Sequence, residues 1–208
     1  MRLRIAFLLV GLVLAASTRA AEAARTIVFF GDSLTAGYGL DDPASEAYPA
    51  LIQQKLDAAG LPWRVVNAGL SGETSSGGLR RVDWILRQPM DIFVLALGGN
   101  DGLRGIEPAV TSANLQGIID RVHARYPAAR IVLAGMQMPP SMGEAYTREF
   151  AAMYTALAAR NHLVLIPFLL ARVAARPEFN QPDGMHPTAA GAAQVADTVM
   201  KRQITLKR

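Results

Sequence analysis

Three kinds of residue in this sequence have the types and spacing for nucleophilic catalysis: a serine, a histidine and an aspartate. Ser33 lies in "VFFGDSLTAGYG", residues 28–39, where an apolar run ends abruptly in small and polar residues. Serine is a poor nucleophile until a neighbouring base removes its proton. His186 is the candidate base, because it follows Asp183 by three residues in the segment "DGMHP". That spacing, through Gly184, lets the Asp183 carboxylate accept from one ring nitrogen and leaves the other to face Ser33.

The other two histidines fit structural roles better. His123 lies near the C-terminal end of a helical pattern, where an imidazole interacts with the helix dipole. His162 follows Asn161 at a helix end and is expected to be a cap or a surface residue. Asp183 and His186 could also do no more than cap the last helix, but that alternative leaves the three-part pattern unexplained.

A serine that attacks a carbonyl creates an oxyanion, which needs fixed hydrogen-bond donors. Three donors are candidates: the backbone N–H of Ser33, the backbone N–H of Gly69 and the side-chain amide of Asn100. Gly69 has no side chain and can bring its N–H close to a ligand. Ordinary turn chemistry would explain each glycine taken singly. Polar clusters after four separate strands, taken together, favour one shared site.

The elements that must hold these residues alternate between short apolar runs and amphipathic segments. The apolar runs predict strands that are covered on both faces, at residues 26–30, 64–67, 92–97, 130–134 and 163–166. The amphipathic segments predict helices, at residues 48–60, 108–127, 146–161 and 188–202. This alternation predicts one domain with an open, mostly parallel sheet and helices on both sides. In such a sheet, ligands bind beyond the carboxyl ends of the strands, which is where the polar clusters lie.

The first residues of the chain are typical of a secretory signal peptide rather than of a folded element. Arg2 and Arg4 precede an apolar run over residues 5–16, and Ala21-Glu22-Ala23 forms an A-x-A cleavage site. Cleavage after Ala20 is an alternative. The apolar run is shorter than the roughly 20 residues that a membrane-spanning helix needs. We therefore expect a signal peptide at residues 1–23, a catalytic domain at residues 24–208, no lasting membrane anchor, and a periplasmic or secreted protein.

Composition excludes several other classes of function. The 208-residue chain has a formal net charge of +4, but no run of Lys or Arg follows the leader, so no nucleic-acid surface is expected. Cysteine is absent, which excludes a cysteine nucleophile and disulfide bonds. Thr35 takes the place of the second glycine of a G-x-S-x-G elbow, and no G-x-G-x-x-G follows the first strand. A metal site at Asp32, Asp101, Asp183 and His186 is disfavoured, because these residues lack ligand spacing.

Four separated blocks, "FGDSLTAGYG", "NAGLSGETSSGGLRR", "LALGGNDGLRG" and "DGMHP", resemble the successive signature blocks of the GDSL, or SGNH, hydrolases. The pattern is most similar to an exported bacterial subgroup of multifunctional acyl-CoA thioesterase I, protease I and lysophospholipase L1, which includes arylesterases. The resemblance implies a three-layer, flavodoxin-like α/β sandwich with a five-stranded parallel sheet. It also implies a Ser33–His186–Asp183 triad, an oxyanion hole formed by Ser33, Gly69 and Asn100, and neither cofactor nor metal.

The expected substrate is a small-molecule or lipid acyl ester, with no obligate protein partner. The resemblance implies activity on aryl esters, acyl thioesters and lysophospholipids. Adaptable apolar residues after the fourth strand are candidates for the acyl-chain side of the cleft: Met136, Met138, Pro139 and Met142. The same residues could instead fill the core. Two other functions stay open, a carbohydrate O-deacetylase acting on cell-wall polymers and a non-catalytic lipid-binding module.

Overall fold

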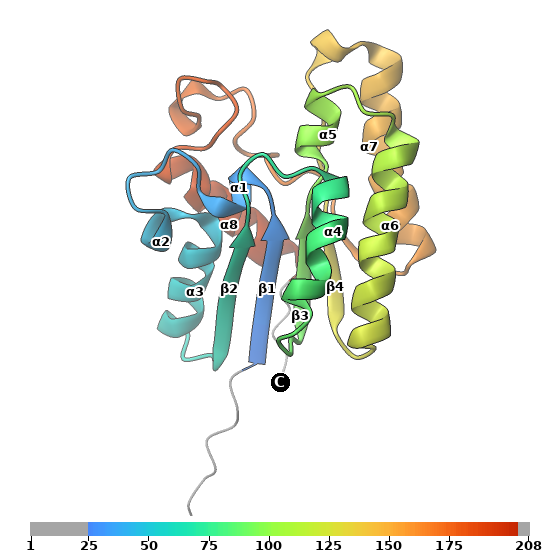
Figure 1. The fold of residues 1–208 in the computed structure, drawn as a ribbon. Helices are drawn as coiled ribbons and strands as arrows, with labels where there is room; N and C mark the ends of the chain where they lie inside the picture. The colour runs from blue at the N-terminus through green and yellow to red at the C-terminus, as the bar shows by residue number, and fades with distance from the viewer. Residues whose placement is uncertain (1–24, 204–208) are drawn as a thin grey trace, which may run out of the picture.

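Five parallel strands form a single sheet in the order β2-β1-β3-β4-β5 in a computed structural model that describes residues 25–203 (Figure 1). The strands are β1 (Arg25–Gly31), β2 (Trp63–Gly69), β3 (Ile92–Ala96), β4 (Arg130–Ala134) and β5 (Val164–Ile166). Each corresponds to a predicted apolar run, with ends that move by no more than two residues. The proposed signal peptide, residues 1–23, lies outside the described residues.

Helices cover both faces of this sheet, as the alternation predicts. They are α1 (Ser33–Ala36), α2 (Pro43–Glu46), α3 (Tyr48–Ala58), α4 (Ser75–Ile85), α5 (Gly99–Leu103), α6 (Pro108–Arg125), α7 (Glu144–Arg160) and α8 (Ala189–Gln203), with short 3₁₀ turns at Pro140–Met142 and Pro177–Phe179. Helices α3 and α8 pack together on one face, and α4, α6 and α7 line the other (Figure 1). The predicted three-layer α/β sandwich is therefore confirmed.

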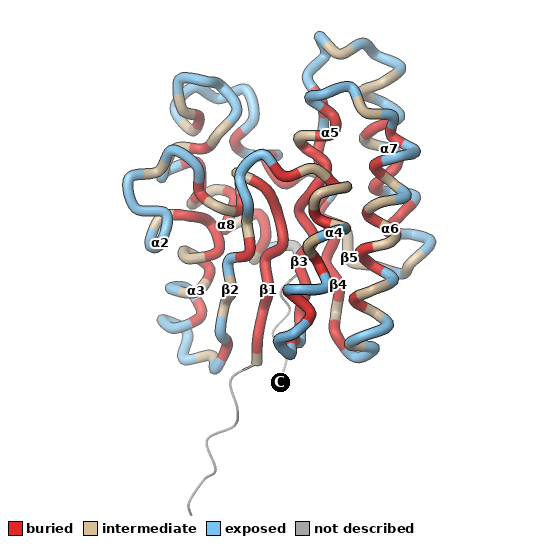
Figure 2. Tube along the Cα trace, in the orientation of Figure 1, coloured by how far each residue is buried: buried red, intermediate tan, exposed pale blue. Residues whose placement is uncertain are grey.

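The centre of the sheet is buried on both sides, which explains its nearly continuous apolar sequence. Strand β3 is buried at every position, and β1 is buried at every position after Arg25 (Figure 2). Phe29, Phe30 and Phe93 have no exposed surface. Between residues 25 and 203, no helix is both long enough and apolar enough to cross a membrane.

The strand order brings the candidate residues together at the carboxyl ends of neighbouring strands. Strand β1 pairs with β2 on one side and with β3 on the other. The chain therefore adds β2 on one side of β1 and then adds β3, β4 and β5 in turn on its other side. This reversal opens a crevice beyond the carboxyl ends of the strands. Ser33 follows β1, Gly69 ends β2 and Asn100 follows β3, so all three come from segments beside this reversal.

Candidate active site

A serine, a histidine and an aspartate form a continuous chain of hydrogen bonds at the crevice. His186 Nε2 lies 2.9 Å from Ser33 Oγ, and His186 Nδ1 lies 2.6 Å from Asp183 Oδ2. Ser33 and His186 are 153 positions apart in the sequence. In this geometry the carboxylate accepts the Nδ1 proton, which leaves Nε2 unprotonated and able to accept the serine hydroxyl proton.

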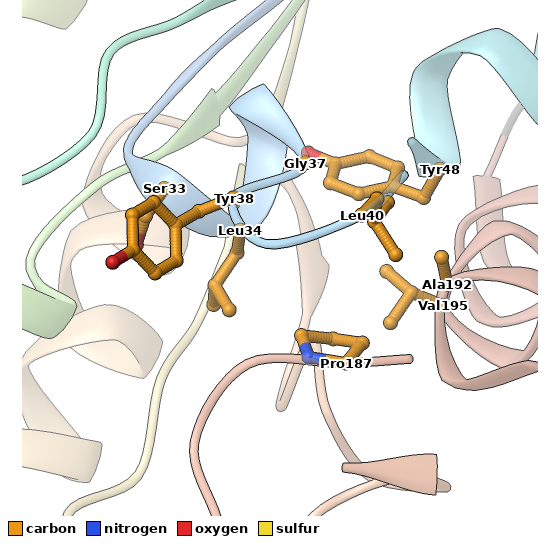
Figure 3. Close-up of a pocket in the computed structure, with 9 residues that line it drawn as sticks. All are labelled: Ser33, Leu34, Gly37, Tyr38, Leu40, Tyr48, Pro187, Ala192 and Val195. Atoms are coloured by element: carbon orange, nitrogen blue, oxygen red, sulfur yellow. The ribbon is translucent and has the colours of Figure 1, made fainter. Parts of the chain in front are cut away.

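The short helix α1 holds Ser33 at the mouth of β1. Asp32 caps this helix, because its side chain accepts a hydrogen bond from the Leu34 N–H at 3.0 Å. The Thr35 and Tyr48 hydroxyls lie 2.9 Å apart and are buried, so the turn is anchored to α3. Beneath the turn, apolar side chains of α1, its following loop and α8 face one another around a small pocket (Figure 3). Ser33 is therefore fixed by a cap, a buried hydrogen bond and apolar packing.

The loop that carries His186 is fixed by its own hydrogen bonds. Asp183 Oδ1 accepts from the backbone N–H groups of Met185, at 2.9 Å, and His186, at 3.0 Å. The Gln181 N–H donates to the His186 carbonyl at 2.7 Å. The Gln181 side-chain amide also donates to the Tyr38 carbonyl at 2.8 Å, which joins the loop that carries His186 to the segment after Ser33. Sequence reasoning did not identify Gln181 or Tyr38, because their contact is between a side-chain amide and a backbone carbonyl that lie far apart in the sequence.

Two carboxylates near Ser33 have pKa values shifted in opposite directions. The backbone N–H of His186, with help from its imidazole and from the Met185 N–H, lowers the pKa of Asp183 to about 2. Burial raises the pKa of Asp32 to about 6, against the lowering effect of the Leu34 N–H. Asp183 is therefore ionised throughout the neutral range and can hold the imidazole in one tautomer.

Of the candidate oxyanion donors, Ser33 and Asn100 line the same cleft, whereas Gly69 is not among the residues that line it. Asn100 lines the cleft with Ser33, and its Nδ2 donates one hydrogen bond to the Glu73 carbonyl at 3.0 Å. Gly69 is packed so closely against α1 that an added methyl group would overlap the backbone nitrogen of Ala36. The Gly69 N–H donates to Asn67 Oδ1 at 3.0 Å in the free protein.

An apolar cleft of about 480 Å³ begins at Ser33 and His186. Three of the four residues predicted for an acyl-chain wall line it: Met136, Met138 and Pro139. Both methionines also belong to the core, so the two alternatives for them are compatible. Met142 differs, because it packs against the core and is not among the lining residues. Phe168, Leu170 and Met185 add to the apolar wall.

The remaining candidates take up structural positions. His123 lies in the last turn of α6, and His162 directly follows α7's cap with a φ of 53°. Asp101 is fully buried and accepts from the backbone N–H of Ser75 at 2.8 Å and from its hydroxyl at 2.5 Å. Among residues 25–203, no three side chains of His, Asp or Glu gather in a group able to hold a metal ion.

Sequence reasoning also missed a buried ion pair behind the candidate oxyanion donors. Glu73, in the loop after β2, pairs with Arg81 of α4, and the exposed fraction of the Glu73 side chain is 3%. Both residues stand in a block matched to the hydrolases, "NAGLSGETSSGGLRR". Their charges alone gave no signal of the pairing, because surface charges are common at such spacing on helices and loops.

Comparisons with known proteins agree with this geometry. Residues 29–194 match the model of the GDSL-like lipase/acylhydrolase family. The chain is 40% identical over 178 residues to "Esterase TesA" of Pseudomonas aeruginosa, which covers 85% of this chain and 87% of that protein. It is 39% identical over 183 residues to "Thioesterase 1/protease 1/lysophospholipase L1" of Escherichia coli K12, covering 88% and 85%.

Among solved structures, the psychrotrophic esterase EstA from Pseudoalteromonas sp., inhibited by monoethylphosphonate, is similar to this chain with a TM-score of 0.80. That match has 31% sequence identity and covers 86% of this chain and 96% of the esterase. The sequence match, the shared fold and the serine–histidine–aspartate geometry point the same way. The chain belongs to the GDSL-like lipase/acylhydrolase family and is a carboxylic ester hydrolase.

Proposed function

We propose that this protein hydrolyses acyl esters and thioesters through an acyl-serine intermediate on Ser33. The observation that carries the proposal is the unbroken contact from Ser33 Oγ through His186 to Asp183, with distances of 2.9 and 2.6 Å. A base oriented by an ionised carboxylate is the arrangement that activates a serine hydroxyl. The match to an esterase inhibited by a phosphonate supports it, because phosphonates react with nucleophilic serines.

In the first step, Ser33 Oγ attacks the substrate carbonyl carbon while His186 Nε2 takes the hydroxyl proton. The tetrahedral oxyanion accepts hydrogen bonds from the Ser33 N–H and the Asn100 amide, and from the Gly69 N–H only once that group releases Asn67 Oδ1. His186 then gives the proton to the departing alcohol or thiol, which leaves an acyl-serine. In the second step, His186 deprotonates a water molecule that attacks the acyl-serine, and it then returns this proton to Ser33 Oγ as the C–Oγ bond breaks and the carboxylic acid is released.

The cleft supports an acyl chain as the group held beside Ser33. Its wall combines Met136, Met138 and Phe168, and flexible thioether side chains adapt to chains of different shape. Aryl esters, acyl thioesters and lysophospholipids all offer such an acyl group, and relatives carry names of these activities. The alternative, a carbohydrate deacetylase, would use aromatic platforms. Trp63 is buried at the start of β2 and Trp84 is exposed on α4, so neither lies at the cleft.

Export is part of the proposal and rests on the sequence. The charged start, the apolar run and the A-x-A site favour a signal peptide at residues 1–23 and a mature catalytic domain at residues 24–208. The protein would then act in the periplasm or outside the cell. N-terminal sequencing of the exported protein tests the cleavage position, and a mature protein that retains residues 1–20 would contradict it.

The nucleophile is tested by Ser33→Ala, with Ser71→Ala as a control at an exposed serine of a neighbouring loop. We expect Ser33→Ala to lose nearly all hydrolysis of p-nitrophenyl esters and all labelling by a serine-directed phosphonate, while the control keeps both. Wild-type activity in Ser33→Ala would refute the proposal. A comparison of a medium-chain acyl ester with an acetylated glycan separates the acyl-ester hydrolase from the deacetylase.

A further inference from the structure

A second hollow adjoins the candidate active site, at the loop that follows β2. It is a groove of about 530 Å³ lined by this loop, by α4 and by the end of α5. Three arginines line it: Arg80 and Arg81 of α4, and Arg104, which caps α5. Leu70, whose exposed fraction is 50%, is the one large apolar residue of its lining. The groove is therefore polar and basic, unlike the apolar cleft beside Ser33.

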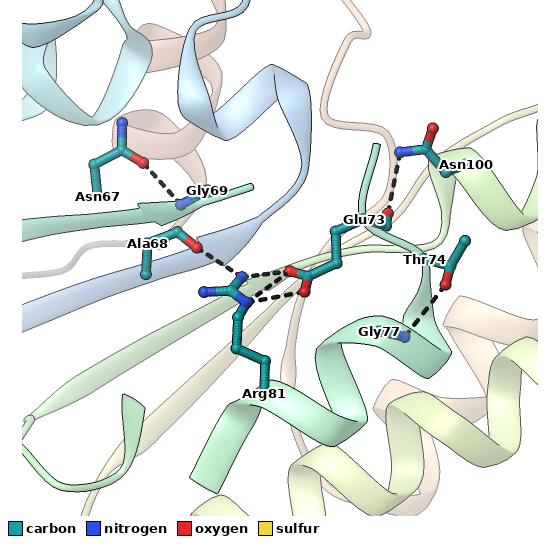
Figure 4. A network of polar contacts seen from close by, with 8 residues as sticks. All are labelled: Asn67, Ala68, Gly69, Glu73, Thr74, Gly77, Arg81 and Asn100. Carbon is teal, nitrogen blue, oxygen red and sulfur yellow. Dashed lines mark hydrogen bonds and ion pairs between the residues drawn. The ribbon is translucent and has the colours of Figure 1, made fainter. Parts of the chain in front are cut away.

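The groove carries a net positive charge, because the only carboxylate among its lining residues is already neutralised. That carboxylate belongs to Glu73, whose two oxygens lie 2.9 and 3.1 Å from Arg81 Nε and whose side chain is 3% exposed (Figure 4). Arg80 and Arg104 are exposed, and neither forms an ion pair within residues 25–203. Two cations without a counter-ion therefore line the same groove.

These two guanidinium groups are held by neutral oxygen atoms. Arg80 Nη1 donates to Ser76 Oγ at 2.7 Å, and Arg104 Nη2 donates to the Gly72 carbonyl at 3.2 Å. A guanidinium has five N–H donors, so each group still has several to offer to a ligand. Its planar fork matches the oxygens of a phosphate, and hydrogen bonds between two charged groups are stronger than those between neutral ones. The groove thus combines the charge and the donors that a phosphate group needs.

The strand order places this groove and the acyl cleft on opposite sides of Ser33. In the order β2-β1-β3-β4-β5, Ser33 follows β1 and Asn100 follows β3. Met136 and Phe168 of the acyl wall follow β4 and β5, whereas the groove lies at the loop after β2. Asn100 joins the two, because it lines the cleft and its Nδ2 donates to the Glu73 carbonyl at 3.0 Å (Figure 4). An ester whose acyl chain occupies the cleft therefore has the groove on its other side, where its leaving group can lie.

We propose that this groove binds a phosphate of the leaving group, through Arg80 and Arg104. The inference rests on the proposed function and names its preferred substrates, acyl esters and thioesters that carry a phosphate on the alcohol or thiol side. Lysophospholipids and acyl thioesters of coenzyme A share this chemistry. The phosphate keeps its charge while the acyl group is transferred, so its contacts stabilise the bound substrate and the transition state equally. Loss of these contacts should therefore raise KM rather than lower kcat.

The test measures how much a phosphate on the leaving group improves hydrolysis. One pair of substrates is decanoyl lysophosphatidic acid and monodecanoylglycerol. The other is decanoyl-CoA and the decanoyl thioester of N-acetylcysteamine, and all are used below their critical micelle concentrations. In each pair, kcat/KM for the phosphate-bearing member divided by that for the neutral member gives a preference ratio. Arg80→Gln and Arg104→Gln should each lower this ratio about 2- to 5-fold, which is the effect of a solvent-exposed charge pair.

Arg87→Gln is the matched control. Arg87 is likewise exposed, forms no ion pair within residues 25–203 and lies just past the end of α4, but it lines a different groove, between α4 and α6. The substitution removes the same charge, so the preference ratio should keep its wild-type value unless a general loss of positive charge sets it. Arg80→Lys keeps the charge and should retain most of the preference that Arg80→Gln loses.

Equal losses on the phosphate-bearing and neutral substrates would assign a structural role to the two arginines and overturn the proposal. An unchanged ratio in both variants, a wild-type ratio of one, or an equal fall in Arg87→Gln would overturn it as well. A response in one pair only supports the site and identifies the phosphate as that of a lysophospholipid or of coenzyme A. None of these results bears on the nucleophile, whereas a wild-type protein that hydrolyses no member of either pair would contradict the proposed function itself.

Discussion

The ring of Tyr38 lies against the imidazole of His186, with centroids 4.7 Å apart and planes inclined by 48°. Tyr38 comes from the segment after α1 and His186 from the loop before α8, so this contact joins the two segments that form the candidate triad. Gln181 strengthens the junction, because its amide nitrogen donates to the carbonyls of Tyr38 and Pro187. His186, the proposed base, is therefore held by the segment that follows Ser33 as well as by Asp183.

Tyr38→Ala should lower kcat/KM about 2- to 5-fold, because the aromatic face stabilises the imidazolium that forms in the transition state. An exposed cation–π contact is worth about 0.5–1 kcal/mol, which corresponds to that factor. Tyr38→Phe keeps the ring and should retain wild-type activity. Initial rates with a p-nitrophenyl ester measure both variants, and equal losses in the two would assign the effect to the hydroxyl instead.

Asp183→Asn should lower kcat by about 10³- to 10⁴-fold while the protein stays folded, because an amide cannot hold His186 in the tautomer that accepts the serine proton. The low pKa of Asp183, about 2, means that its ionised form is favoured in the folded protein. The stability it contributes is present above its usual pKa of 3.8 and is lost as the pH falls toward 2. Circular dichroism checks folding. A variant with near-wild-type kcat would show that the carboxylate is dispensable.

Asp32 should contribute a pH dependence of stability opposite in sign to that of Asp183, and Asp32→Asn should remove it. Burial raises the pKa of Asp32 from 3.8 to about 6, so between these values the folded protein holds a proton that the unfolded chain releases. Its stability contribution is therefore greatest below pH 3.8 and is lost as the pH rises through 6. At about 1.4 kcal/mol per pKa unit, the loss is about 3 kcal/mol.

Asparagine is as good a helix cap as aspartate, so the cap on α1 is retained in this variant. Urea unfolding at pH 4 and pH 7 should show that Asp32→Asn gains about 2 kcal/mol relative to wild type between the two conditions, because part of the loss has already occurred at pH 4. A stability difference that stays constant with pH would contradict the raised pKa of Asp32.

Gly69→Ala should destabilise the protein and lower kcat together, because the new methyl group meets the Ala36 backbone and displaces the turn that carries Ser33. Gly117→Ala, in α6, is the matched control. There the methyl group meets the end of a Leu79 side chain at 3.0 Å, which can move, and alanine favours the helix. Thermal unfolding and steady-state kinetics distinguish the two, and a harmless Gly69→Ala would argue against the close packing.

Met138→Ala should shift the acyl preference toward longer chains, because Met138 lines the cleft and its removal lengthens the cavity. The ratio of kcat/KM between long and short p-nitrophenyl esters should change about 4-fold for each methylene that the enlarged cavity accepts, since each buried methylene contributes about 0.8 kcal/mol. Met142→Ala, which shortens a residue outside the lining, should leave the ratio unchanged. A Met138→Ala enzyme with the wild-type ratio would remove Met138 from the acyl site.

The sheet was predictable from sequence because both of its faces are covered. Strands such as β3 then need apolar residues at every position, and the resulting run marks their length. The start of helix α4 was not predicted, because its first turn, Ser75-Ser76-Gly77-Gly78, contains poor helix formers. That turn is held by the cap of Thr74 and by Asp101, which lies 26 residues away from Ser75 in the chain. Such long-range support leaves no local pattern.

The reactive residues of the candidate site were predictable from sequence, but the buried residues around them were not. Ser33, His186 and Asp183 were found from residue types and spacing, and the structure brings them within hydrogen-bond distance, while their catalytic roles stay predictions. The Glu73–Arg81 pair could not be found in this way, because the burial of Glu73 and the contact of Arg81 with the Ala68 carbonyl are set by the fold and leave no local pattern in the sequence. The boundary between residues 23 and 24 also stays a prediction.

The distance in sequence between Ser33 and His186 sets when hydrolysis can begin during the life of the polypeptide. A ribosome makes the hydroxyl early and supplies its proton acceptor only 153 positions later, just before the final helix. On the proposed roles of Ser33 and His186, a nascent or prematurely terminated product that stops short of residue 186 lacks the base and should not hydrolyse esters. On these proposed roles, synthesis of the segment that contains His186 is the step that completes the active site.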